Sequence, residues 1–164
     1  TGPVLGPETG HYYQLLRRGV SWTEARDAAA AAVYRGGAGH LVTITSAAEN
    51  AFVVAYVAAC EIVWIGLTDE AQEGTFAWVT GEPLSFTAWN AGEPNDAGDG
   101  EDYGELQGDC GEARSFWNDL SSQEEQGRFY IIEYERARLI PTLGRAGLLA
   151  LAIAVLALAV RRLA

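Results

Sequence analysis

Residues 89–103 read Trp-Asn-Ala-Gly-Glu-Pro-Asn-Asp-Ala-Gly-Asp-Gly-Glu-Asp-Tyr, and the region closes with Trp-Asn-Asp at 117–119. Eight acidic residues and no Lys or Arg lie between positions 93 and 112. So much like charge repels itself unless the segment is disordered or binds a cation. Disorder is disfavoured by nearby aromatic residues that normally pack: Trp89, Tyr103, Phe116 and Trp117. Oxygen ligands from Asp, Glu and Asn suit Ca²⁺, which takes roughly 6–8 of them.

Length and composition narrow the class of protein. The 164 residues suffice for one domain of ordinary size plus an appendage. A net charge of −11 argues against nucleic-acid binding, which needs a basic patch. All 11 basic residues are Arg, which together with abundant Ala and Gly indicates a high-GC bacterial genome. Because the chain begins at Thr1 without Met or an apolar leader, we expect a mature chain or a fragment.

The sequence pattern predicts a single α+β domain. Two segments have the spacing of a helix capping box, Ser21 with Glu24 and Ser46 with Glu49. The Ala-rich run after the first box predicts a helix that ends at glycines 36–39. The acidic region is interpreted as one long loop, and loops of that length are usually functional. In chain order the predicted elements are a strand at 12–16, a helix to about 34, a strand at 40–44, a helix to about 59, and strands at 63–67, 75–79 and 128–134.

The end of the chain predicts a membrane anchor. Fifteen uncharged, mostly aliphatic residues run from Ala146 to Val160 and are followed by two Arg. A helix starting at Leu143 would span about 27 Å at about 1.5 Å per residue, enough for a thin bilayer. The Arg pair should stay cytoplasmic, which places the acidic domain outside. A buried helix of the domain is the alternative, disfavoured because the segment is apolar on every face.

Three motifs in order resemble those of a C-type lectin-like domain. They are Trp64 to Leu67 (Trp-Ile-Gly-Leu), Glu93 to Asn95 (Glu-Pro-Asn) and Trp117 to Asp119 (Trp-Asn-Asp). The resemblance covers about residues 10–134. It implies a C-type lectin-like fold with two helices, small antiparallel sheets and a long calcium-binding loop, in which the first and last strands pair. It also implies a cis bond before Pro94, a state accessible before proline.

The resemblance implies two calcium positions. Glu101 stands six residues after Asn95, as in mannose-type members. The sugar-binding site would use Glu93, Asn95, Glu101, Asn118 and Asp119. The accessory site would use Asp69, Glu73, Asp96 and Asp102, and the stretch 68–74 matches there too.

The same motif implies a sugar class. Two vicinal hydroxyls could complete the calcium coordination, while a ligating Glu accepts a hydrogen bond from a hydroxyl and a ligating Asn donates one. In this family Glu-Pro-Asn goes with mannose-like sugars that bear equatorial 3- and 4-hydroxyls, and Gln-Pro-Asp goes with galactose-like sugars. We therefore expect mannose, glucose, N-acetylglucosamine or fucose as ligands. Since the ligating carboxylates must be ionised, calcium binding should weaken at acid pH.

The cysteines depart from the family pattern. Members usually tie the first helix to the last strand by a disulfide, but Ala28 to Ala32 and Ile131–Ile132 occupy those segments, and Tyr103 stands where a loop cysteine is common. Each native disulfide contributes about 2–5 kcal/mol, so calcium should contribute more to the stability of the loop here. Whether Cys60 and Cys110 pair stays open.

The tail resembles bacterial C-terminal sorting signals processed by exosortase-type transpeptidases. The resemblance rests on Ile140-Pro141-Thr142-Leu143, the apolar run and the terminal Arg residues; the segment 144–147 replaces the usual acidic-Trp-Gly element. If it is processed, the anchor is transient. In either case we expect a cell-surface or exported protein divided into a lectin-like domain at 10–135, a linker and sorting motif at 136–142 and a transmembrane helix at 143–164.

Two other functions are alternatives to sugar binding. A calcium-organised lectin-like module could bind a protein partner rather than a sugar. Paired carboxylates such as Glu93, Glu101 and Glu105 could serve glycoside hydrolysis. A general acid, however, needs a pKa raised by an apolar pocket, whereas this loop should bind a cation, so we expect no enzyme.

The remaining conspicuous side chains are interpreted as structural. His11 and His40 have no evident companions that would make them metal ligands or catalytic bases. Ser21 and Ser46 are helix caps. Three tryptophans are expected in the core: Trp64, Trp78 and Trp117.

Overall fold

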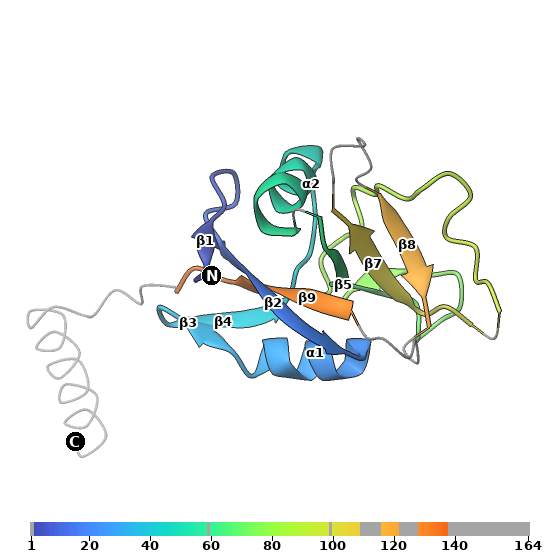
Figure 1. Ribbon diagram of the computed structural model, residues 1–164, viewed down its shortest axis with the longest axis horizontal. Coiled ribbons are helices and arrows are strands. Elements are labelled where there is room, and N and C mark those ends of the chain that lie inside the picture. The colour runs from blue at the N-terminus through green and yellow to red at the C-terminus, as the bar shows by residue number, and fades with distance from the viewer. Residues whose placement is uncertain (1, 59, 99, 109–115, 122–127, 138–164) are drawn as a thin grey trace, which may run out of the picture.

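The computed structural model describes residues 2–58, 60–98, 100–108, 116–121 and 128–137 of the chain. Its elements follow one another along a compact sheet flanked by helices (Figure 1). They are β1 (Val4–Leu5), β2 (Tyr12–Val20), α1 (Trp22–Ala30), β3 (Val33–Tyr34), β4 (Gly37–Leu41), α2 (Ala47–Phe52), the π-helix η1 (Val53–Ala58), β5 (Ile62–Thr68), β6 (Ala77–Trp78), β7 (Tyr103–Gln107), β8 (Trp117–Leu120) and β9 (Arg128–Tyr134).

Strand β9 is the centre of the sheet. It pairs antiparallel with β2, which joins the first long strand to the last one as the lectin resemblance implied. It also pairs antiparallel with β4 and, at Val63 and Trp64, parallel with β5. From β5 the sheet continues through β7 to β8, so the order is β1-β2-β9-β5-β7-β8. The domain therefore has a sheet half around β2, β4 and β9 and a loop half beyond β5, on the right of Figure 1.

The first helix begins where predicted but ends earlier. Ser21 Oγ accepts from the Glu24 amide at 3.3 Å and a Glu24 carboxylate oxygen accepts from the Ser21 amide at 3.0 Å, which confirms the capping box. The predicted extension to about residue 34 is wrong. Residues 33–34 instead pair with 37–38, and the turn between them has positive φ at Arg35 (50°) and Gly36 (82°). The hairpin pairing overrides the helix propensity of the Ala-rich run.

The second helix is capped as predicted by Ser46, whose hydroxyl accepts from the Glu49 amide at 3.2 Å. The reciprocal bond of a capping box is absent here. The Glu49 carboxylate, which is buried, instead accepts from the Thr45 amide at 2.8 Å and from the Tyr13 hydroxyl at 2.7 Å. The chain then continues through η1 to Ala58, close to the predicted helix end.

The strands are predicted with uneven success. Those at 63–67 and 128–134 are confirmed, and the first strand is longer than predicted. The strand at 40–44 lies earlier, at 37–41, and the one at 75–79 shrinks to Ala77–Trp78. The interpretation of the whole acidic region as one irregular loop is wrong, because β7 and β8 pair along 103–106 and 117–120. Gly104 permits β7 to pack closely on β5, since a Cβ there would lie 2.9 Å from the Cβ of Leu67.

The core consists of two groups of buried side chains. The three tryptophans that were expected in the core are buried, which confirms that prediction. Trp64, Trp78 and Trp117 are 0%, 3% and 0% exposed. Trp22 is buried beneath α1 and stacks on Tyr103, with ring centroids 4.5 Å apart. Tyr103 stands where a cysteine is common in the family. It makes an aromatic contact there in place of a disulfide.

The structure describes only part of the predicted tail. Within the described ranges, no helix is long and apolar enough to cross a membrane. The predicted transmembrane helix at 143–164, most of the sorting motif and Cys110 lie outside those ranges.

Candidate metal centre in the acidic loop

The acidic loop is anchored to β8 where it begins. The Trp117 amide donates to the Ala88 carbonyl at 2.8 Å, and the Asn90 amide donates to the Trp117 carbonyl at 2.9 Å. The indole of Trp89 lies edge-to-face on that of Trp117, with centroids 5.9 Å apart. Because Trp117 is fully buried, these contacts fix the start of the loop to the core.

Asp119 then holds the centre of the loop. It is 1% exposed, and its two carboxylate oxygens accept from the backbone amides of Asn95 (3.2 Å) and Asp96 (2.9 Å). The peptide bond between Glu93 and Pro94 is cis, as the resemblance implied. Asp96 adopts a positive φ of 47°. One strand residue thus organises the backbone around the Glu-Pro-Asn motif.

Glu93 and Glu101 gather beside Asp119. Burial raises the pKa of Glu93, and the charge of Asp119 raises it further. Burial also raises the pKa of Glu101, with contributions from Asp119 and Glu93. The Ala97 amide donates to Glu101 at 2.9 Å, which opposes that shift. Four of the five residues of the predicted sugar site, all but Asn118, therefore lie together.

Asn118 is oriented differently from this group. Its amide nitrogen donates to the Asp119 carbonyl at 2.6 Å and to the Glu105 carboxylate at 3.4 Å. Glu105 is 2% exposed and accepts from Arg128 Nε at 2.7 Å. No sequence motif predicts this Glu105–Arg128 pair, because the two residues are 23 positions apart. Arg128 therefore offsets the charge of the β7 carboxylate that accepts from Asn118.

The residues of the predicted accessory site also come together. The Asp69 amide donates to the Asp102 carbonyl at 3.2 Å, which joins the end of β5 to the start of β7. The charge of Asp69, followed by burial and Asp96, raises the pKa of Glu73. Burial and the charge of Asp69 raise the pKa of Asp102. All four predicted carboxylates thus act on one another.

The fit to a cation rests on two orphaned oxygens. Glu93 Oε2 and Asp69 Oδ1 are buried and have no hydrogen-bond partner among the described residues, one in each predicted set. A buried charged oxygen without a partner is costly. No three His, Cys, Asp or Glu side chains of the described ranges are yet arranged to enclose a metal ion. The residue types and the unpaired oxygens nevertheless fit Ca²⁺, which bonds to oxygen.

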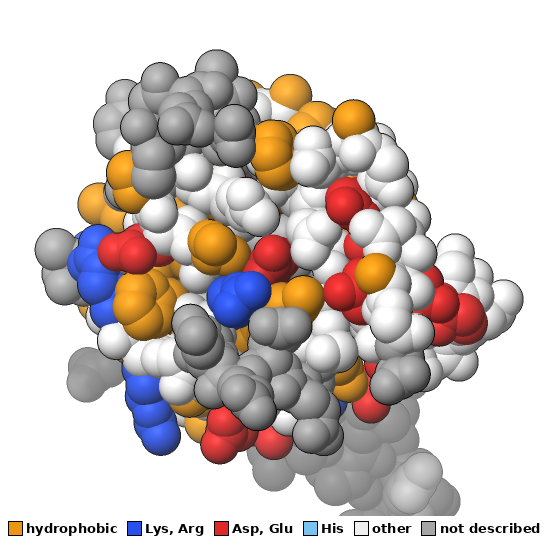
Figure 2. All heavy atoms as spheres, turned by 45° about the vertical axis from the view of Figure 1, so that its right-hand side comes forward, with side chains coloured by type: hydrophobic (Ala, Val, Ile, Leu, Met, Phe, Trp, Pro, Cys, Tyr) orange, Lys and Arg blue, Asp and Glu red, His pale blue; other side chains and the backbone are white. Residues whose placement is uncertain are grey.

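The surface of this half is correspondingly acidic. Figure 2 turns the loop half toward the viewer and shows acidic side chains gathered on that face. Of the other two carboxylates weighed with Glu93 for glycoside hydrolysis, Glu101 is half-buried and Glu105 is paired with Arg128.

Comparison with known proteins places this arrangement in a family. The family described as "Lectin C-type domain" matches residues 19–131. C-type lectin domain family 17, member A, of Homo sapiens is 35% identical over 115 residues, 70% of this chain and 28% of that protein. The C-type lectin CEL-I from Cucumaria echinata has a TM-score of 0.66 at 28% identity, covering 76% of this chain and 90% of that one.

A further solved structure is similar over the same region. The cow C-type carbohydrate-recognition domain of CD23, solved in the presence of GlcNAc2Man3 oligosaccharide, has a TM-score of 0.62 at 29% identity and covers 75% of this chain and 86% of that one. The chain spans less than a third of the length of the first curated relatives it matches. Because the family described as "Lectin C-type domain" matches residues 19–131, most of the chain, the chain belongs to the C-type lectin domain family.

Proposed function

We propose that this domain binds mannose-, glucose-, N-acetylglucosamine- or fucose-type sugars through calcium held in the acidic loop. The observation that carries the proposal is the buried, unpaired Oε2 of Glu93 beside the gathered carboxylates of Glu101 and Asp119. The oligosaccharide named for the cow CD23 domain contains both GlcNAc and Man, which supports this sugar class. Family membership favours a binding module over an enzyme.

The residues of this chain would act in distinct ways. Asp119 holds the backbone of Asn95 and Asp96 in place while its carboxylate contributes negative charge to the site. Glu93 and Glu101 would accept hydrogen bonds from sugar hydroxyls, and the amide of Asn95 would donate one. When bound, Ca²⁺ supplies coordination positions that two vicinal hydroxyls complete. Asp69, Glu73, Asp96 and Asp102 would hold a second ion that braces the loop.

The orientation of Asn118 suggests how the site is completed. Its side-chain nitrogen is engaged by Glu105 and by the Asp119 carbonyl, so its other amide atom, the oxygen, is the one left to serve as a ligand. The Arg128–Glu105 pair would keep that orientation. We therefore assign Asn118 to the site with Glu105 as its positioning partner.

Calorimetric titration of the full chain tests the proposal. Calcium is titrated first, and mannose is then titrated with and without calcium. Asn95→Asp should retain calcium binding and lose the heat of mannose binding, because a carboxylate cannot donate to a hydroxyl. Asn90→Asp is the matched control, since Asn90 lies in the same loop and its side chain accepts only from the Ala91 amide at 2.8 Å among its described bonds.

The outcomes separate the remaining alternatives. Calcium binding with no response to mannose, glucose, N-acetylglucosamine or fucose would favour a protein partner. A strong preference for galactose would contradict the proposed sugar class. We also propose that the domain is displayed outside the cell by the segment 143–164, and detection of the full chain only in the cytoplasmic fraction would count against this.

A further inference from the structure

A second cluster of metal-ligating side chains lies in the sheet half, far along the chain from the acidic loop. The register of β9 places Glu133 opposite both Tyr13 of β2 and His40 of β4. Two residues on, Glu135 projects from the same side of the strand. His11, just before β2, reaches both carboxylates, with Nδ1 2.6 Å from Glu133 and Nε2 3.5 Å from Glu135. Both histidines therefore have carboxylate partners that the sequence alone does not reveal.

The hydrogen bonds of the two imidazoles fix the position of their protons. His11 Nδ1 lies 2.6 Å from a carboxylate oxygen of Glu133, and His40 Nδ1 lies 2.9 Å from the Leu41 carbonyl oxygen. Both partners are acceptors only, so each Nδ1 carries a hydrogen. In the neutral imidazoles, both Nε2 atoms then present lone pairs.

Both Nε2 atoms lie near the same carboxylate. His11 Nε2 and His40 Nε2 each lie 3.5 Å from an oxygen of Glu135, and they approach different oxygens. His40 Nε2 is buried with no hydrogen-bond partner among the described residues. A neutral imidazole nitrogen this close to a carboxylate is repelled by it unless a proton or a cation lies between them. The arrangement therefore calls for a positive charge at this point.

We propose that His11, His40 and Glu135 form a binding site for a divalent transition metal, with Zn²⁺ the best fit. Zinc binds imidazole nitrogen and carboxylate oxygen at about 2.0–2.2 Å, which places neighbouring ligand atoms of a tetrahedral site roughly 3.3–3.5 Å apart. The two nitrogen–oxygen distances of 3.5 Å run to different oxygens of Glu135, and each is close to that spacing. Zinc-bound histidines characteristically donate their other N–H to a carboxylate or a backbone carbonyl, as Glu133 and Leu41 accept here.

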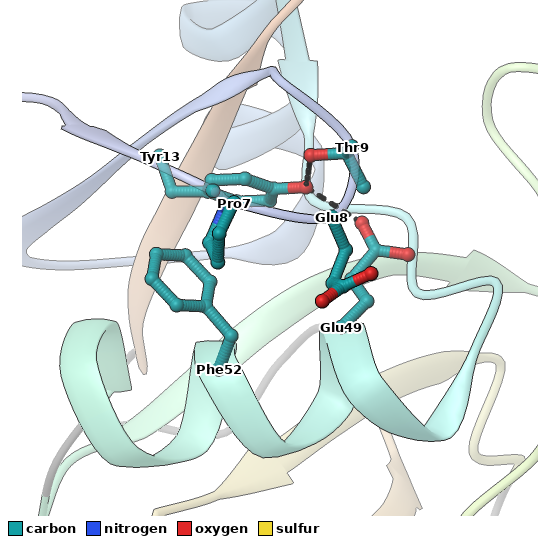
Figure 3. A pocket seen from close by; sticks show the side chains of 7 residues that line it. Pro7, Glu8, Thr9, Tyr13, Glu49 and Phe52 are labelled. Atoms are coloured by element: carbon teal, nitrogen blue, oxygen red, sulfur yellow. Dashed lines mark hydrogen bonds between the residues drawn. The ribbon is translucent and has the colours of Figure 1, made fainter.

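The surroundings hold the metal-facing groups in place. Glu133 is 2% exposed and also accepts from the Thr43 amide at 3.0 Å and from the Tyr13 hydroxyl at 3.2 Å. Figure 3 shows the Tyr13 hydroxyl hydrogen-bonded to Thr9 and Glu49. This network orients His11 from behind through Glu133.

Closure of the site requires the Glu135 carboxylate and the two imidazoles to approach one another. The three ligands do not yet enclose an ion. The Glu135 side chain is 50% exposed, however, and can rotate between the two imidazoles. The bound metal would cross-link β2 and β4 through the segment that follows β9, and a water molecule would complete the coordination.

Titration of Zn²⁺ into the full chain at about pH 8, with Ca²⁺ in excess to occupy oxygen sites, tests the proposal because metal binding requires neutral imidazole. We expect one zinc per chain, with proton release detected as a dependence of the heat on the buffer. Co²⁺ in place of zinc should give the visible absorption of a four-coordinate site.

Two variants locate the site. Glu135→Gln and His40→Gln should each weaken zinc binding by more than the roughly 10–100-fold loss typical of an outer-shell change. Glu135 is half-exposed, so Glu135→Gln keeps the fold, which its unchanged melting temperature without zinc verifies. Glu8→Gln is the matched control, an exposed acid outside the cluster. Absence of zinc binding in excess calcium, or equal binding by both variants and wild type, would overturn the proposal.

The test is independent of the proposed sugar binding. Glu135→Gln should leave the calcium and mannose titrations unchanged. Zinc binding lost in Glu93→Gln but retained in Glu135→Gln would assign the ion to the acidic loop and overturn the site in the sheet half.

Discussion

The two halves of the domain treat their buried carboxylates in opposite ways. In the sheet half, Glu133 accepts hydrogen bonds from backbone, hydroxyl and imidazole donors, and Glu49 accepts from Thr45 and Tyr13. In the loop half, Glu93 and Asp69 each retain a buried oxygen with no partner among the described residues. The sheet half completes its buried carboxylates Glu133 and Glu49 from the protein itself, whereas Glu93 and Asp69 of the loop half are left to be completed by an ion.

The difference follows from the supply of donors. Strands β2, β4 and β9 lie side by side, so each carboxylate meets backbone amides and side chains from two neighbours. In the acidic loop, the amides of Asn95 and Asp96 already donate to Asp119 of β8. Carboxylates that repel one another and lack hydrogen-bond donors from the protein favour the binding of a cation. This contrast predicts which changes respond to calcium.

Replacing Trp117 should have the largest effect, because this side chain belongs to both halves. Its ring is 0% exposed, and its Nε1 donates to Asn50 at 3.0 Å. Trp117→Ala should lower the free energy of unfolding by about 3–5 kcal/mol, measured by urea denaturation. It should also weaken calcium binding, since Trp117 anchors the start of the loop.

Trp22→Ala is the comparison in the sheet half. Trp22 is 1% exposed and donates to the Ile65 carbonyl at 2.8 Å. A loss of stability of similar size is expected, but calcium affinity should stay within about twofold, because sites with no shared partners are usually independent. Equal loss of calcium affinity in both variants would break the division into halves.

Calcium itself should produce the next largest effect. A ligand at 100 times its dissociation constant stabilises the folded state by about 2.7 kcal/mol, and we expect a gain of that order when calcium replaces EGTA in urea denaturation. Asp119→Asn should abolish the gain, because it removes the charge that organises Asn95 and Asp96. Asp27→Asn, an exposed acid on α1 paired with Arg26, should retain the full gain.

How much of this was predictable differs between the halves too. The family resemblance carried by the Glu-Pro-Asn and Trp-Asn-Asp motifs implied loop residues that the structure brings close together. The two Ser caps were predicted correctly, because a cap is a local signal. Strands β7 and β8 were missed because Gly104 and the acids hide their pattern. The first helix was made too long because Ala propensity says nothing about the pairing of Val33 and Tyr34 in a hairpin.

The histidine cluster was invisible to sequence reasoning for a different reason. His11 meets Glu133 across 122 positions, and only the pairing of the first and last strands brings them together. Once that pairing is known, the registers Tyr13↔Glu133 and His40↔Glu133 place these polar residues of β2, β4 and β9 next to one another in the sheet. The signal therefore lay in the topology and not in any motif.

A cap substitution should have a smaller effect that calcium does not alter. Ser21→Ala removes the acceptor for the Glu24 amide at the start of α1 and should cost about 0.5–2 kcal/mol. Thr23→Ala is the control on the same turn, because the Thr23 hydroxyl has only the Ser21 hydroxyl as its described partner. Urea denaturation with calcium and with EGTA should give the same loss, and a loss found only in EGTA would link α1 to the loop half.

The smallest predicted effect is the dependence of calcium-free stability on pH. Mutual repulsion raises the pKa of Glu73, and burial raises those of Glu101 and Asp102, above ordinary values of 4.5 for Glu and 3.8 for Asp. The folded protein therefore binds more protons than the unfolded chain just above those values. Its free energy of unfolding should therefore increase slightly as pH falls from about 7 to about 5. The same gain disappears when pH rises through the raised pKa values. The effect is small because solvent screens these carboxylates.

Calcium should reverse the sign of this effect. Protons compete with the ion for the same carboxylates, so the calcium-loaded protein should lose stability over the same interval. In the sheet half, the hydrogen bond to Glu133 raises the pKa of His11 above 6.5, which adds stability on acidification that starts at higher pH and is independent of calcium. His11→Gln removes that contribution. The free energy of unfolding of His11→Gln, measured by urea denaturation at three pH values, should then rise on acidification in EGTA and fall on acidification in calcium. The same pH dependence in both conditions would place the shifted carboxylates outside any calcium site.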